Sequence, residues 1–318
     1  MFAKEPDLLF QSNELLNITI QAPIEKIKRK NKNSLKFDGT LSYLDVDAEL
    51  INVDMKIEVR GNHRLKKSVC RFPPLKISFK KRKTKGTLFK KQKTLKLVTQ
   101  CDAYRNIYTD YLMKEYLAYR ILNIITPQSF YVRLVNINYQ GESSSKTNFA
   151  FFIEHKKRLA KRLGARSLSI EGTSAVHLES IHLNQVSLFQ LLIGNIDWSA
   201  TSGGRSECCH NIKLFDKGGV DDILAIPYDF DFSGLVKAKY AVPSKDLRLD
   251  SITDRRYRGY CRNNEHLDAN IELFNHKKPE ILALLQDFSH LSEKQKKSAS
   301  ITLKSSTKSS MIQSELSE

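Results

Sequence analysis

Apolar residues that recur at spacings of three and four predict a helix over residues 106–125. One face of this helix carries Tyr108, Leu112, Glu115, Tyr119 and Leu122. A carboxylate within such an apolar stripe is costly to bury unless it has a charged or hydrogen-bonding partner. The pattern therefore predicts either a buried and paired Glu115 or a Glu115 at the rim of its face.

Alternating apolar and polar residues predict strands before and after this helix. Strands are expected at residues 16–20, 51–59 and 74–79, onward to about Leu97, and again between residues 131 and 153. From His155 the spacing becomes helical, and Gly164 is expected to end the first helix there. The fold class predicted is α+β, with a strand-rich lobe over residues 1–154 followed by a mainly helical lobe over 155–290. Residues 148–154 would form the hinge.

Beyond Leu291 the sequence becomes rich in Ser, Lys and Thr without periodicity, which predicts a disordered tail over 291–318. No segment has the ~18 apolar residues needed to cross a bilayer. The first residues also lack the apolar stretch of a signal peptide. We therefore expect a cytoplasmic protein, or an exported one whose signal is missing from this sequence.

A largely apolar run over residues 183–194 predicts a second, buried helix that ends at Gly194, which leaves Asp197 in the following loop. Residues 222–227 predict a short apolar strand that leads into Tyr-Asp-Phe-Asp-Phe-Ser-Gly. Strand alternation would place Asp229 and Asp231 on one face. The acids thus follow the ends of regular elements.

These residues suggest a magnesium and nucleotide site. Magnesium takes oxygen ligands, usually one or two carboxylates together with substrate phosphates. Asp229, or Asp231 in its place, could hold the metal with the amide oxygen of Asn211, and Asp197 could orient a hydroxyl nucleophile. The alternative is that the acids cap turns or pair with the many Lys and Arg residues.

A phosphotransfer site of this kind also pairs a strand lysine with a helix glutamate. Lys76 lies in the predicted strand 74–79, so it is the natural partner of Glu115. In the alternative, Lys76 is simply solvated.

Composition adds a strong positive charge. The 318 residues are 41% hydrophobic, enough for a sizeable core, and the formal net charge is +17. Between Arg60 and Gln100 there are fifteen Lys or Arg residues and no Asp or Glu. This stretch fits a polyanion or phosphate-bearing partner, and residues 80–93 predict an exposed basic ribbon, unless they are only a solvated face.

The five cysteines do not settle whether the protein is cytoplasmic or exported. Cys70 and Cys101 each border a predicted strand, and they could form a disulfide in an oxidising compartment. Cys208 and Cys209 precede His210, but adjacent cysteines match the spacing of structural zinc sites poorly.

Several short motifs, in this order, resemble the CotH spore-coat kinase family over roughly residues 50–240. They are Arg60-Gly-Asn62, Pro-Leu-Lys-Ile-Ser-Phe, Cys-Asp-Ala-Tyr-Arg-Asn, Phe-Phe-Ile-Glu154, Asn-Ile-Asp197 and Tyr-Asp-Phe-Asp-Phe-Ser-Gly. The resemblance implies an atypical, two-lobed protein-kinase-like fold, frequent export, and ATP- and Mg²⁺-dependent (or Mn²⁺-dependent) phosphorylation of Ser or Thr in a protein acceptor.

The resemblance also assigns roles to individual residues. Lys76 would contact the phosphates with Glu115 as its partner, Asp197 would be the catalytic aspartate, and Asn211 and Asp229 would bind the metal. The residues placed beside the nucleotide are Arg60, Asn62 and Glu154. Departures from kinase patterns are the lack of a glycine-rich phosphate loop and the fourteen-position separation of Asp197 from Asn211.

Two other functions are compatible with these motifs. One is a degenerate scaffold that binds nucleic acid or another anionic polymer through residues 60–100. The other is a non-catalytic scaffold that binds nucleotide without turnover.

Overall fold

The computed structural model describes residues 4–29, 35–102, 105–202, 208–243 and 247–305. The chain divides into two compact units. The barrel unit comprises Glu5–Leu112 and Tyr131–Arg158, and the C-terminal unit comprises Met1–Lys4, Met113–Phe130 and Leu159–Glu318. Neither unit is a continuous segment, and the division differs from the predicted boundary at residue 154.

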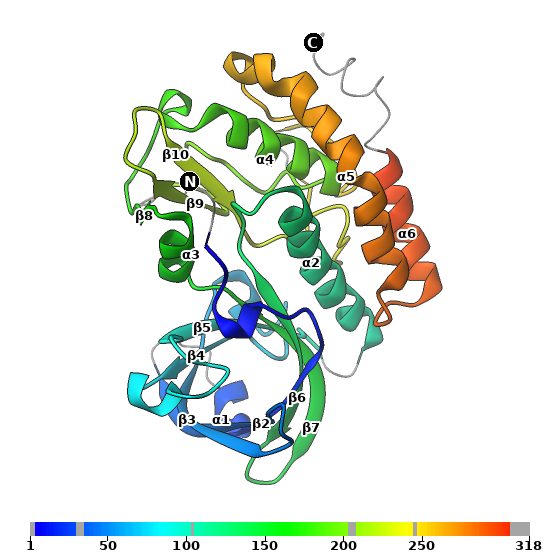
Figure 1. The fold of residues 1–318 in the computed structure, drawn as a ribbon. Coiled ribbons are helices and arrows are strands. Elements are labelled where there is room, and N and C mark those ends of the chain that lie inside the picture. Colours follow the sequence, from blue (N-terminus) through cyan, green and yellow to red (C-terminus); the bar gives the residue numbers. More distant parts are fainter. Residues whose placement is uncertain (1–3, 30–34, 103–104, 203–207, 244–246, 306–318) are drawn as a thin grey trace. The chain divides into compact units, whose positions relative to one another are not determined.

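The barrel unit is built on a closed seven-stranded sheet in the order β1-β2-β3-β4-β5-β7-β6 (Figure 1). Its strands are β1 (Leu16–Gln21), β2 (Lys36–Leu44), β3 (Leu50–Val59), β4 (Leu75–Phe79), β5 (Thr94–Thr99), β6 (Val132–Gln140) and β7 (Ser145–Ile153). Neighbouring strands run antiparallel except β1 and β6, whose parallel pairing aligns Leu16 with Val135. This parallel pair closes the barrel.

Alternate side chains of each strand fill the barrel interior, as the period of two requires. The fully buried residues include Leu41, Ile57, Leu95 and Phe152. Phe89 joins them from the connection between β4 and β5, with its ring centroid 5.3 Å from Phe79. That single aromatic residue anchors a connection that is otherwise largely polar.

The surface of the same connection carries the basic residues. It contains η3 (Lys81–Thr84), and its exposed cations are Lys80, Lys81, Arg82, Lys83, Lys85, Lys90, Lys91 and Lys93. Lys83 forms an ion pair with Asp54 on β3. The predicted exposure of residues 80–93 is confirmed for these cations, whereas their binding of an anionic partner stays a prediction.

Three further short helices belong to this unit: η1 (Leu8–Phe10), α1 (Ile24–Arg29) and η2 (His63–Leu65). A disulfide joins Cys70 to Cys101. The sequence left this pairing open, and the structure forms it.

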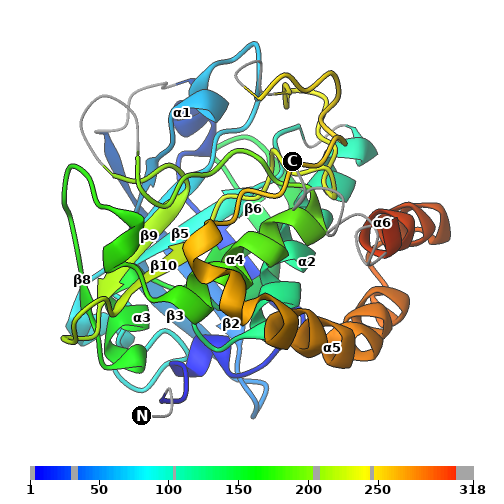
Figure 2. The ribbon, with the colours of Figure 1, turned by 90° about the horizontal axis from the view of Figure 1, so that it is seen from above.

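The C-terminal unit holds an antiparallel sheet in the order β10-β9-β8, formed by Ile223–Pro227, Ile212–Asp216 and Arg166–Ser167. Its helices are η4 (Ala175–His177), α4 (Ser180–Ile193), η5 (Cys261–His266), α5 (Leu267–Asp287) and α6 (Glu293–Ser305). Helix α4 packs against β10, α5 and α6 (Figure 2). Helices α2 (Asn106–Ile125) and α3 (Lys156–Leu163) each contribute residues to both units.

The individual elements follow the sequence closely. The predicted helix over 106–125 is α2, and the one expected to end at Gly194 is α4, with Gly194 as a left-handed cap at φ 63°. Likewise α3 is followed by Gly164, and the strands expected at 74–79 and 222–227 are β4 and β10. Glu115 is buried, which agrees with the first of its two predicted placements and not with a position at the rim of the helix face.

The predicted fold class is wrong. A closed barrel of mixed strand direction and a separate three-stranded sheet replace the expected two-lobed kinase-like arrangement. Residues 148–153 are no hinge, because they lie within β7, which is paired on both sides between Ala150 and Ile153. The expected disordered tail from Leu291 is wrong for residues 293–305, which form α6, and residues 306–318 lie outside the described part.

One expectation about membranes is met. Among the described residues, no helix is both long enough and apolar enough to cross a bilayer.

Candidate functional site

Asp197 lies in a short loop that hydrogen bonds hold to the end of helix α4. The Asn195 side chain donates to Gln190 Oε1 at 2.9 Å and accepts the backbone N–H of Asp197 at 3.1 Å. Gly194 accepts a backbone hydrogen bond from Gly234 at 2.9 Å. A residue fixed in this way keeps its geometry without a ligand, which is what a catalytic side chain needs.

Arg258 holds the same loop from the other side. Its guanidinium donates to the carbonyl oxygens of Ile196, at 2.8 Å, and of Trp198, the two neighbours of Asp197. The guanidinium also lies 5.4 Å from the centroid of the Trp198 ring. These bonds satisfy carbonyls next to the negative end of α4, where a cation is favourable.

The Asp197 carboxylate has two neighbours with hydrogen-bond donors. His210 Nε2 lies 2.6 Å from Asp197 Oδ1, and Asn211 Nδ2 donates to Asp197 Oδ2 at 2.9 Å and to the Asp197 carbonyl at 2.8 Å. The hydrogen bond that His210 donates to Asp197 raises the pKa of His210 above its ordinary value, and the charges of Asp197 and Asp229 act in the same direction. Asp197, His210, Asn211 and Asp229 thus form one electrostatically connected group.

The orientation of the Asn211 amide follows from its partners. Both groups that it faces on Asp197 are acceptors, so its nitrogen must point toward them and its side-chain oxygen away. Among the described residues, no hydrogen bond to that oxygen is found. Asn211 also has a φ of 53°, in the left-handed region that asparagine enters more readily than most residues.

Asp229 lies just beyond the end of β10. Its φ is 67°, and its backbone N–H donates to the Tyr119 hydroxyl at 2.8 Å. The next residue, Phe230, is fully buried, with its ring centroid 4.6 Å from that of Tyr119. The Asp229 side chain is exposed. The backbone is therefore anchored on Tyr119 and Phe230 while the carboxylate faces solvent.

Asn211 and Asp229 are brought together by the β9–β10 pair. Ile212 opposes Pro227 at the end of that pair, and the backbone N–H of Tyr228 donates to the Asn211 carbonyl at 3.0 Å. The predicted strand alternation of Asp229 and Asp231 is wrong, because β10 ends at Pro227 and Asp229 is left-handed.

The two candidate metal acids are not equivalent. Asp231 is buried, and its Oδ2 accepts a hydrogen bond from the Tyr240 hydroxyl at 3.1 Å. Asp229 is the exposed one. Of the two, only Asp229 offers its carboxylate to a solvent-borne ligand.

The chemistry of these donors suits magnesium bound together with a phosphate. The described residues contain no cluster of three or more His, Cys, Asp or Glu side chains arranged to hold a metal. Magnesium commonly takes only one or two protein ligands and completes its shell with water and substrate phosphates. Asn211 and Asp229 fit that kind of site, whereas a closed zinc or calcium site needs more ligands.

Four of the five predicted nucleotide-side residues lie in the barrel unit. Lys76 forms an ion pair with the buried Glu58, its cross-strand neighbour on β3. Glu115 belongs to the C-terminal unit, so its pairing with Lys76 stays a prediction.

The other three residues on that side have separate positions. The Arg60 backbone N–H donates to the Pro74 carbonyl at 2.9 Å, and Asn62 is exposed at the start of η2. Glu154 is buried and accepts the backbone N–H of Tyr131 at 3.3 Å. Their predicted roles in nucleotide binding stay predictions.

Sequence reasoning assigned no role to three residues of this site. His210 had a signal, since it precedes Asn211, but its contact with Asp197 depends on the β9 register. Arg258 and Tyr119 had none, because they lie 61 and 78 positions from Asp197 along the chain. Comparison with protein-family models and with curated proteins gave no match to this sequence.

Proposed function

We propose that this chain is an ATP- and Mg²⁺-dependent phosphotransferase, and that Asp197 accepts the proton of a hydroxyl acceptor, most simply Ser or Thr of a protein. The observation that carries the proposal is the orientation of Asn211, whose nitrogen is held by Asp197, so that its side-chain oxygen points away from that carboxylate. The exposed Asp229 directly follows Tyr228, whose backbone N–H donates to the Asn211 carbonyl. The ordered motifs that resemble CotH kinases support the same activity. Manganese is an acceptable substitute for magnesium at such oxygen ligands.

Asp197 would act as the positioning group and base. Its carboxylate is partly exposed, and its backbone is fixed by Asn195 and by the Arg258 bonds on both sides. Asn211 and Asp229 would supply the protein oxygens to magnesium. When bound, Mg-ATP would supply the phosphoryl group and neutralise its charge.

His210 would control access to the Asp197 carboxylate. A protonated imidazole donates to Asp197 Oδ1 and so competes with the acceptor hydroxyl for that carboxylate. The pKa of His210 is raised, so this competition should end only above the ordinary histidine pKa, and the rate should rise there.

Transfer of labelled phosphate from ATP tests the proposal, with the protein itself and a Ser-rich peptide as acceptors. We expect Asp197→Asn to lower the rate at least about 100-fold, as loss of a general base does. Asp229→Asn should raise the Mg²⁺ concentration needed for half-maximal rate. Asp268→Asn is the matched control, since Asp268 is exposed at the start of α5 in the same unit.

Two outcomes would contradict the proposal. Absence of label with either metal, together with a melting temperature that Mg-ATP does not change, would exclude both phosphotransfer and nucleotide binding. Thermal stabilisation by Mg-ATP without transfer would identify a non-catalytic nucleotide-binding protein.

A second candidate function is supported by the basic ribbon of residues 80–93. Its cations are exposed while Phe89 fixes the connection in the barrel core. A surface of this kind binds anionic polymers with an affinity that falls steeply with salt. A shallow salt dependence of binding to polyphosphate or nucleic acid would refute it.

A further inference from the structure

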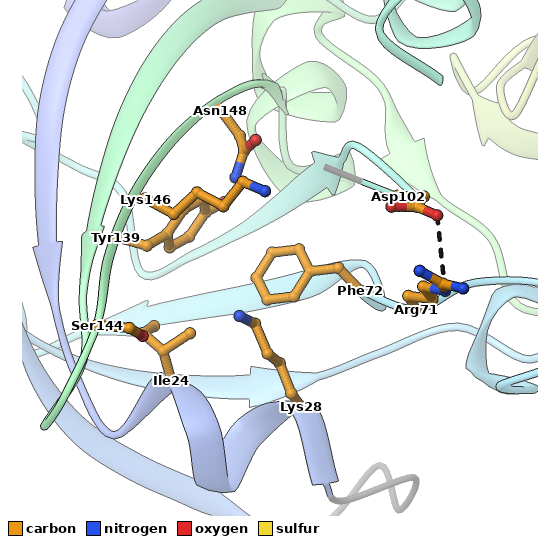
Figure 3. A pocket seen from close by; sticks show the side chains of 9 residues that line it. All are labelled: Ile24, Lys28, Arg71, Phe72, Asp102, Tyr139, Ser144, Lys146 and Asn148. Carbon is orange, nitrogen blue, oxygen red and sulfur yellow. Dashed lines mark ion pairs between the residues drawn. The ribbon is translucent and has the colours of Figure 1, made fainter. Parts of the chain in front are cut away.

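One cavity of the barrel unit is unrelated to the carboxylate site. It has a volume of about 200 Å³ and is bounded by α1, the β6–β7 hairpin and the segment around the Cys70–Cys101 disulfide (Figure 3). Mouths of barrels are common ligand sites because strands and connections supply walls that do not collapse.

The polar lining of this cavity is mainly cationic. It comprises Lys28 from α1, Arg71 from the disulfide segment, Lys146 from β7, and a single carboxylate, Asp102. Asp102 already faces two guanidinium groups, with its Oδ2 3.6 Å from Arg71 Nε and 3.7 Å from Arg105 Nε. The cavity therefore retains an excess of positive charge that an anionic ligand would offset.

Aromatic residues contribute most of the apolar lining of the cavity. The rings of Phe72 and Tyr139 are both buried and meet edge to face with their centroids 5.2 Å apart. Lys28 Nζ lies 5.6 Å from the Phe72 ring, and Figure 3 shows its side chain extending toward that ring. Burial raises the pKa of Tyr139 far above its ordinary value, so its phenol adds no negative charge.

The walls are fixed before any ligand arrives. The backbone N–H groups of Arg71 and Phe72 both donate to the Cys101 carbonyl at 3.0 Å, next to the disulfide. On the opposite side, Glu25 of α1 accepts hydrogen bonds from Ser144 Oγ at 2.5 Å and from the Glu142 backbone at 3.3 Å. Such preorganisation lowers the entropic cost of binding.

The size of the cavity limits the ligand. A dry cavity of about 150 Å³ is known to hold benzene, whereas drug-sized ligands occupy about 300–1,000 Å³. A cavity of about 200 Å³ admits one ring with a compact charged group. A phosphate monoester carries a charge of about −1.5 to −2, which matches the three cations and one acid better than a carboxylate does.

We propose that this barrel-mouth cavity binds a small single-ring aromatic phosphate, with the phosphate beside Lys28 and Lys146 and the ring against Phe72. A complete nucleotide is too large for it. The inference stands independently of the phosphotransferase activity.

Titration of the whole chain with phenyl phosphate, followed by ³¹P NMR or calorimetry, tests the proposal. Lys28→Met should weaken binding of phenyl phosphate and of inorganic phosphate by at least about tenfold, as loss of a charged hydrogen bond does. Phe72→Leu should weaken the binding of phenyl phosphate roughly fivefold and leave the binding of inorganic phosphate unchanged. Lys157→Met removes the same charge from an exposed position on α3 of the barrel unit, away from the cavity lining and from the basic ribbon, and should change the binding of neither ligand.

Asn148→Phe gives a further check because the larger side chain narrows the cavity without changing its charge. It should exclude phenyl phosphate while the melting curve stays cooperative. The proposal is overturned if phenyl phosphate does not bind, if it binds no better than inorganic phosphate, or if Lys28→Met and Lys157→Met weaken its binding equally.

Discussion

His182 should make the stability of the C-terminal unit fall in mild acid. Its side chain lies in α4 and is 1% exposed. Burial lowers the pKa of this imidazole from 6.5 to about 4 in the folded chain. Between these two values the unfolded chain binds a proton that the folded chain does not, so stability declines as the pH falls below 6.5 and the loss is complete below about 4.

The size of the effect follows from the pKa difference. Each pKa unit corresponds to about 1.4 kcal/mol, so the full cost is about 3.5 kcal/mol, and about 2.5 kcal/mol is lost by pH 4.5. That is a large part of the 5–15 kcal/mol that stabilises a typical domain. His182→Gln removes the titration and should show a smaller loss between pH 7.5 and 4.5 than the wild type.

The assay is urea unfolding at the two pH values, followed by fluorescence. Trp198 is the sole tryptophan of the chain, is buried, and belongs to the same unit as His182, so its emission reports on that unit. His276→Gln is the control, because His276 is an exposed histidine on α5. The reasoning is refuted if wild type and His182→Gln lose the same free energy of unfolding on acidification.

Three further predictions concern other parts of the molecule. The phosphotransfer rate should rise with pH through a value above 6.5, the ordinary histidine pKa, and His210→Gln should abolish that limb; an unchanged profile would contradict the role of His210. Replacing Cys70 and Cys101 together by Ala should lower the free energy of unfolding of the barrel unit by about 3.5 kcal/mol in urea, since their bond closes a 31-residue separation. Reduction of the wild type should lower it by nearly the same amount, because it breaks the same bond. Tyr119→Phe should cost about 1 kcal/mol and raise the Mg²⁺ requirement, whereas Tyr108→Phe should not; equal Mg²⁺ curves would contradict the anchoring of the metal ligand.

The sequence was sufficient to predict most individual elements of this protein. Helix α2 has a strong apolar period, and α4 ends at a glycine that adopts the left-handed conformation. These are local properties, set by a few neighbouring residues. Local pattern also indicated that Asp197 follows a rigid helix.

The global arrangement was not predictable in the same way. The closure of the barrel depends on Leu16 pairing with Val135, and no alternation within either strand specifies a partner 119 positions away. The order of the short motifs suggested a kinase-like fold. Such motifs reflect the chemistry of a site, however, and carry no information about which strands pair. Similarly, Lys76 was assigned to Glu115 on chemical grounds, while its cross-strand neighbour Glu58 was overlooked.

The parallel pair β1–β6 has a consequence for synthesis on the ribosome. Strands β1 to β5 emerge first, and both β1 and β5 then present an unpaired edge. One hairpin, β6–β7, covers both of them, since β6 pairs with β1 and β7 with β5. A nascent chain that stops before Ile153 therefore carries two open strand edges, which favour aggregation. Folding of the barrel must wait until its last hairpin has left the exit tunnel.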